Sequence, residues 1–114
     1  KHIKKIAGPK AEVRMASGKN PSKISPTDSR AFNAIREICK EMDPKAIVAP
    51  YLVMGGTDAC YYEPICENIY RYAPFKVDTS FLLLTHGTNE RIPISAMSDA
   101  VAFFKNYVKK ASDR

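Results

Sequence analysis

Apolar and polar side chains recur with two different periods along the 114-residue chain, and these periods predict where helices and strands lie. Residues 1–7 have the pattern of the last turns of a helix, which the Gly-Pro pair that follows would end. Residues 11–15 alternate with period two, which is typical of a half-exposed strand. A turn or linker is expected at 18–22, and the charge balance changes after it.

The clearest helix signal begins with a Ser-Pro-Thr-Asp sequence at residues 25–28. Ser25 is the expected N-cap, Pro26 suits the first helical position, and Asp28 resembles the acid of a capping box. An Asp-Pro pair at 43–44 predicts the end of the helix. Between these limits the apolar side chains recur on one face at helical spacing: Phe32, Ile35, Ile38, Cys39 and Met42.

The later part of the chain has the pattern of an α/β domain. Strands are predicted at 45–50, 68–72 and 81–84, and the continuous apolar run inside the first is typical of a parallel strand buried on both faces. Ser95 is the expected cap of a final helix. Its expected apolar face consists of Met97, Val101, Phe104 and Val108. Helix, strand, loop, strand and helix together indicate an α/β fold class.

The net charge of +6 is concentrated near the N-terminus, where seven of the 18 basic side chains lie in the first 23 residues. A small basic binding module, for nucleic acid or a protein partner, is therefore an alternative reading. The basic segment lacks the interleaved aromatic residues of a single-strand binder, which favours a solvated helix face. No apolar run is long enough to span a bilayer, and no membrane partner is expected.

The three cysteines, Cys39, Cys60 and Cys66, form no Cys-x-x-Cys pair. An odd number with this spacing indicates neither a disulfide framework nor a cysteine zinc site. Free thiols in a reducing compartment are the expected state, and this predicts a cytoplasmic location.

Two short motifs carry candidate chemistry. His86 directly follows a predicted buried strand, at the position where open α/β sheets place their ligand sites. The Gly-Gly-Thr-Asp sequence at 55–58 allows close approach of the backbone to a ligand. Thr57 adds a hydroxyl, and Asp58 can tie the loop by accepting backbone N–H bonds. Taken singly, each motif also fits a plain structural role, as the end of a strand or a surface turn.

In combination, three motifs resemble a known family in the same order along the chain. They are Gly-Gly-Thr-Asp-Ala at 55–59, Tyr-Arg-Tyr-Ala-Pro at 70–74 and His-Gly-Thr-Asn-Glu-Arg-Ile at 86–92. The family comprises the co-catalytic dizinc peptidases and amidohydrolases, including aminoacylase, carboxypeptidase S, glutamate carboxypeptidase and succinyl-diaminopimelate desuccinylase. The resemblance covers about residues 12–110, and the carboxypeptidase S and N-acyl-amino-acid amidohydrolase branch is the most similar.

The resemblance implies a division of the chain into two parts. Residues 1–20 would be the tail of an α+β lid (dimerisation) domain, contributing its last helix and strand. Residues 21–114 would be the C-terminal part of a zinc-peptidase-type catalytic domain, a mainly parallel sheet with flanking helices. The implied partners are a peptide or N-acyl amino acid substrate and a second copy joined through the lid domain; nucleic acid is not expected.

The resemblance also assigns roles to single residues. His86 would be a zinc ligand, with Glu90 and Asp58 supporting the metal site from outside the ligand set. Gly56 and Thr57 would line the substrate pocket. Two zinc ions, or other divalent metals, would polarise the scissile amide carbonyl and lower the pKa of a bridging water, whose proton a glutamate takes.

Two departures from the family pattern limit what this chain does alone. Cys60 stands where the family often has arginine, so that position carries no charge for substrate contact or loop tethering. The family's other ligands, a His-x-Asp motif, a Glu-Glu pair and a further acid, are absent, and His2 is the only other histidine. A catalytic zinc ion normally needs at least three protein ligands. We therefore expect a C-terminal fragment, inactive by itself, whose general base lies upstream.

Overall fold

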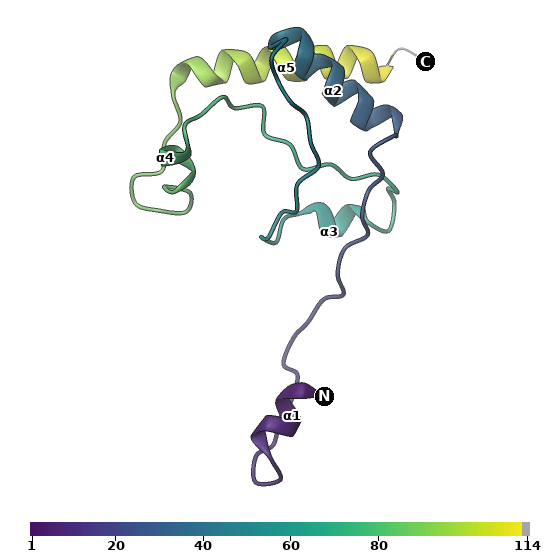
Figure 1. The fold of residues 1–114 in the computed structure, drawn as a ribbon, viewed down its shortest axis with the longest axis vertical. Helices are drawn as coiled ribbons and strands as arrows, with labels where there is room; N and C mark the ends of the chain where they lie inside the picture. The colour runs from purple at the N-terminus through teal and green to yellow at the C-terminus, as the bar shows by residue number, and fades with distance from the viewer. Residues whose placement is uncertain (113–114) are drawn as a thin grey trace.

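The structure is a computed structural model that describes residues 1–112. Within these residues there are five helices and no β-strand, and the rest is turns and irregular segments. The Cα radius of gyration is 19.3 Å, whereas a compact domain of this length has about 13 Å. Helix α1 (His2–Ala7) buries no residue and lies apart at the end of an extended segment (Figure 1). Its predicted end is confirmed, because Gly8 follows it with a φ of 71°. None of the described helices is long and apolar enough to cross a bilayer.

Helix α2 (Arg30–Met42) confirms the predicted helix and corrects its start. Ser29, not Ser25, is the N-cap, and its hydroxyl accepts the backbone N–H of Phe32 at 3.1 Å. The Ser25 hydroxyl instead bonds both backbone groups of Ile69, each at 2.9 Å. Ser25 therefore anchors a distant segment, so the first turn of the helix is capped four residues later than the sequence predicts. Three of the predicted face residues, Phe32, Ile35 and Ile38, are buried.

Helix α5 (Ile94–Ser112) packs across α2, and this is the only helix pair in contact within residues 1–112 (Figure 1). The predicted helix is confirmed, but its predicted apolar face is wrong. Ala96, Ala100 and Phe103 are the buried residues of α5, and Phe103 packs with Ile35 and Ile38 of α2. The predicted face lies one residue further along and stays between 49% and 64% exposed: Met97, Val101, Phe104 and Val108.

Polar side chains tie the C-terminal turn of α5 to α2. The Lys110 ammonium lies 2.9 Å from carboxylate oxygens of both Glu37 and Glu41. The Arg30 guanidinium donates to the backbone carbonyl of Lys110 at 3.1 Å. Exposed ion pairs contribute little stability, so these contacts mainly fix which turns of the two helices lie opposite each other.

The strands predicted at 11–15, 45–50 and 68–72 do not form, and the corresponding part of the α/β prediction is not confirmed. A strand satisfies its backbone N–H and C=O groups through a neighbouring strand. Within residues 1–112 no second strand is present to supply such a ladder. Several apolar side chains of these segments are correspondingly open to solvent, with Ile47 94% and Met15 87% exposed.

The strand predicted at 81–84 is wrong for a local reason. Asp78 caps helix α4 (Thr79–Leu82), and its carboxylate accepts the backbone N–H of Ser80 at 2.8 Å. Further turns follow, with the N–H of Leu84 bonded to the carbonyl of Phe81. Capping and helical turns satisfy these backbone groups without a partner strand. A further short helix, α3 (Ala59–Tyr62), follows the Gly-Gly-Thr-Asp loop.

The core consists of Ile35, Ile38 and Phe103, and Ile38 is fully buried. We expect Ile38→Ala to lower the free energy of unfolding of the chain by about 2 kcal/mol or more, because it removes buried methyl groups and leaves a cavity. Urea unfolding followed by helical circular dichroism measures this change. The control is Ile24→Ala at a position that is 96% exposed, where we expect a change below about 0.5 kcal/mol. Equal effects of the two substitutions would contradict this core.

Candidate functional site

The Gly-Gly-Thr-Asp loop is held together by Thr57. Its hydroxyl oxygen accepts the backbone N–H of Ala59 at 3.3 Å and the side-chain Nε–H of Arg71 at 2.9 Å. Asp58 precedes α3, but its carboxylate makes no capping bond, so the expected tie to the backbone comes from Thr57 instead. A Cβ added at Gly56 would meet no atom within 4 Å. The predicted roles of Gly56, Thr57 and Asp58 toward substrate and metal remain predictions.

His86 lies in a tight loop directly after α4. Its φ of 63° is in the left-handed region, and its backbone N–H donates to the Glu90 carboxylate at 3.2 Å. Gly87 is needed beside it, because an added Cβ would lie 3.0 Å from the backbone oxygen of Leu84. The Glu90 carboxylate thus holds the loop that carries His86, whose side chain is exposed. The metal-binding role of His86 stays a prediction.

The structure does not bring the two motifs together. No hydrogen bond or ion pair links residues 55–58 to 85–91, and α3 and α4 lie apart in Figure 1. Within residues 1–112 no group of three His, Cys, Asp or Glu side chains is placed to hold a metal ion. One exposed imidazole does not supply the three or more ligands of a catalytic zinc ion. The described residues alone therefore do not fit a complete zinc site.

The Cys60 side chain has a cation beside it, Lys19. The Lys19 ammonium donates to the Cys60 sulfur at 3.2 Å and lies 5.3 Å from the ring centre of Tyr61. The hydrogen bond to Cys60 is the main cause that raises the pKa of Lys19, which is fully protonated at neutral pH. Sequence reasoning missed this contact, because the two residues are 41 positions apart.

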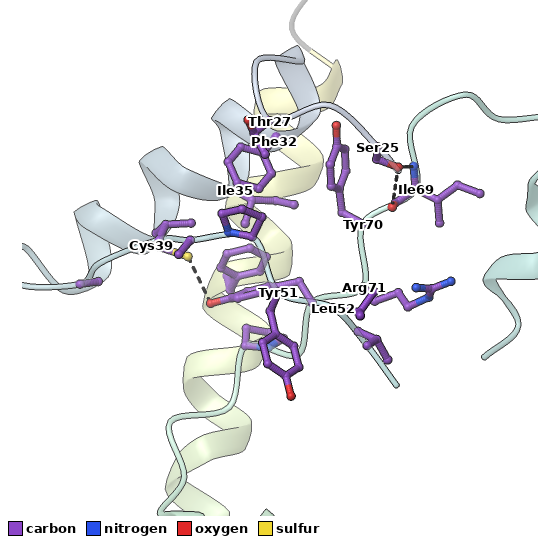
Figure 2. Close-up of a pocket in the computed structure, with 18 of the residues that line it drawn as sticks. Ser25, Thr27, Phe32, Ile35, Cys39, Tyr51, Leu52, Ile69, Tyr70 and Arg71 are labelled. Atoms are coloured by element: carbon purple, nitrogen blue, oxygen red, sulfur yellow. Dashed lines mark hydrogen bonds between the residues drawn. The ribbon is translucent and has the colours of Figure 1, made fainter. Parts of the chain in front are cut away.

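A cavity of about 600 Å³ is lined by residues of α2 and α5 and of the segments 46–53 and 69–76 (Figure 2). Tyr72 lies at its wall, with its ring centre 4.8 Å from that of Phe103. The Cys39 thiol donates to the Tyr72 hydroxyl at 3.1 Å. Burial, followed by this hydrogen bond, raises the pKa of Tyr72 to about 12. The cavity walls are mostly apolar and aromatic and hold no histidine, so this space is separate from the His86 motif.

The amino-acid sequence matches a known protein family and is similar to several known proteins. The sequence profile described as "Peptidase family M20/M25/M40" matches residues 3–110. "Probable carboxypeptidase S-like 2" of Dictyostelium discoideum is 32% identical over 78% of this chain. The human "N-fatty-acyl-amino acid synthase/hydrolase PM20D1" is 26% identical over 93% of it, and "Carboxypeptidase S" of Saccharomyces cerevisiae is 23% identical over 82%.

The matched regions are a small part of these relatives. The alignments cover 17%, 22% and 18% of the three proteins, so the chain spans about a fifth of their length. No solved structure matches the chain.

The contact between Glu90 and the His86 backbone gives a direct test of the loop. We expect Glu90→Ala to make the His86 amide exchange with solvent about two- to tenfold faster, because an exposed hydrogen bond is lost. Hydrogen exchange followed by NMR measures this. The control is Glu67→Ala, since the exposed Glu67 makes no hydrogen bond within residues 1–112. Unchanged protection of His86 in Glu90→Ala would show that the carboxylate does not hold the loop.

Proposed function

Because this chain belongs to peptidase family M20/M25/M40, we propose that it is the C-terminal part of a zinc-dependent metallopeptidase or amidohydrolase. The observation that carries the proposal is the His86 loop, in which the Gly87 turn and the Glu90 carboxylate fix the backbone of an exposed histidine. A rigid, accessible imidazole is suited to bind a metal ion. The hydrolysed bond is an amide bond of a peptide or an N-acyl amino acid, in line with the names of the relatives.

The metal site is proposed to be shared between this chain and the rest of the parent protein. His86 supplies one ligand, and the remaining ligands and the glutamate general base come from outside residues 1–112. When bound, two zinc ions would supply Lewis-acid polarisation of the carbonyl and a water of lowered pKa. The part that this chain itself plays is to hold, through Glu90, the backbone of the loop that carries one imidazole.

The proposed domain division is supported by how the chain is arranged. Residues 1–20 are assigned to the lid domain and residues 21–114 to the catalytic domain. Helix α1 buries none of its side chains, and it stands apart from α2 and α5 in Figure 1. A homodimer formed through the lid domain is part of the same proposal.

The α/β sheet is proposed for the parent protein, with partner strands from outside this chain. Residues 46–49 and 69–72 run through the structure without helical turns, and their backbone groups have no ladder. The exposed side chain of Ile47, and that of Leu52 just beyond the first segment, would be covered by such a sheet. The exposed face of α5 around Val101 and Phe104 gives a second apolar surface that the parent protein would bury.

A cytoplasmic location is proposed from the cysteines. Cys39, Cys60 and Cys66 are all free thiols in the structure. Unpaired thiols persist in reducing compartments, whereas secreted proteins tend to oxidise them.

We expect the full-length protein that carries this chain to hydrolyse N-lauroyl-alanine or a dipeptide with zinc. We expect His86→Ala to lower kcat/KM at least about 100-fold, because support residues alone account for about 10- to 100-fold effects at metal sites. Steady-state assays with added zinc measure this, and His2→Ala is the control histidine. The 114-residue chain alone should show no zinc-dependent turnover. Turnover by that chain which His86→Ala abolishes would contradict the shared site, and full activity of His86→Ala in the parent protein would contradict the role of His86.

A further inference from the structure

The connecting segment, residues 12–24, joins the N-terminal part of the chain to the part that Ser25 anchors. Within residues 1–112 its backbone makes no hydrogen bond, and every side chain in it except Val13 is exposed. A segment without backbone hydrogen bonds has many accessible orientations, because nothing in the main chain selects one of them. Its place therefore depends on the contacts of its side chains.

Lys19 makes the contacts that hold the connecting segment. Its ammonium donates to the Cys60 sulfur at 3.2 Å and lies 5.3 Å from the ring centre of Tyr61, so it contacts two neighbouring residues of α3. Among the hydrogen bonds, ion pairs and ring contacts within residues 1–112, these alone join residues 1–20 to a later part of the chain. Figure 1 shows the connecting segment passing beside α3.

The chemistry of α3 suits an ammonium group at this place. A neutral thiol sulfur is a weak hydrogen-bond acceptor, and the face of a tyrosine ring attracts a cation. The Glu63 carboxylate, directly after α3, adds a weaker attraction to Lys19. The family often has arginine where this chain has Cys60, and an arginine there would repel the ammonium at contact distance. The contact thus requires that residue 60 carries no positive charge.

We propose that Lys19 is a latch that docks the end of the lid-domain tail on α3 of the catalytic domain, through the Cys60 sulfur and the Tyr61 ring. This rests on the proposed function, which assigns residues 1–20 and 21–114 to those two domains. It goes beyond that function by naming the contact that restrains one domain relative to the other. Exposed hydrogen bonds and cation–π contacts are weak, so the latch opens and closes readily.

A charge exchange between the two latch residues tests this in the 114-residue chain. Backbone ¹⁵N relaxation measures the order parameters of residues 18–20. We expect Cys60→Arg and Lys19→Glu each to lower them into the flexible range, below about 0.6, because each removes the docking contact. The double variant with both substitutions should return them to the wild-type values, since the exchanged charges attract each other again.

Two matched variants control for the change of charge itself. Lys23→Glu reverses the charge of a second lysine of the connecting segment, one that makes no hydrogen bond, ion pair or ring contact within residues 1–112. Cys66→Arg introduces an arginine at another exposed cysteine. Both should leave the order parameters of residues 18–20 unchanged, and helical circular dichroism verifies that every variant is folded.

Limited proteolysis repeats the test in the full-length protein. Trypsin cleaves the exposed chain after Lys19, and mass spectrometry follows that single bond. We expect Cys60→Arg to speed this cleavage about two- to tenfold, because a hydrogen bond and a cation–π contact of an exposed side chain are lost. Cys66→Arg should cleave after Lys19 at the wild-type rate.

The proposal is overturned if neither single substitution changes the order parameters, or if Lys23→Glu lowers them as much as Lys19→Glu does. It is also overturned if the double variant stays as mobile as the single ones, because the substitutions then act on α3 and not on the pair. None of these measurements needs zinc or turnover. A restored double variant of an inactive protein would reject the proposed function and keep the latch. Loss of activity in His86→Ala with unchanged order at residues 18–20 would do the reverse.

Discussion

Ile38 has no exposed surface in the contact between α2 and α5, and the extended segment that carries Arg71 packs onto that contact. Phe103 of α5 completes the core with Ile35 and Ile38 of α2. Tyr70 and Tyr72 pack against aromatic rings of the two helices and so hold the extended segment between them. Arg71 projects from that segment to the Thr57 loop. Loss of the helix contact would therefore release the candidate substrate loop as well.

The helices α1, α2 and α5 were predictable from the sequence because their periodicity and hydrogen bonds are local, whereas the one-turn helices α3 and α4 were not. The spacing of Phe32, Ile35 and Ile38 was sufficient to place α2 and its buried face. Details set by distant partners were not predictable from the sequence. The Ser25 hydroxyl bonds the backbone of Ile69 and does not cap α2. The buried face of α5 depends on its packing against other segments. The strands predicted at 11–15, 45–50 and 68–72 failed for the same reason, since their hydrogen bonds depend on other segments, and none within residues 1–112 supplies them.

The contacts of the candidate site also fall into local ones and ones between distant residues. The turn at His86 and Gly87 and the return of the Glu90 carboxylate lie within five residues, and the supporting role of Glu90 had come from the family resemblance of this motif. The Arg71–Thr57 and Lys19–Cys60 contacts join positions 14 and 41 residues apart. Nothing in the local sequence pattern points to these two contacts.

The central claim is that His86 is one ligand of a metal site completed from outside this chain. Zinc bound per protein molecule, measured by elemental mass spectrometry after exhaustive dialysis, tests it most directly. The account predicts zinc in the full-length protein, less zinc in its His86→Ala variant, and none in the 114-residue chain. Unchanged zinc in the full-length His86→Ala variant, or one zinc ion held tightly by the 114-residue chain, would contradict it.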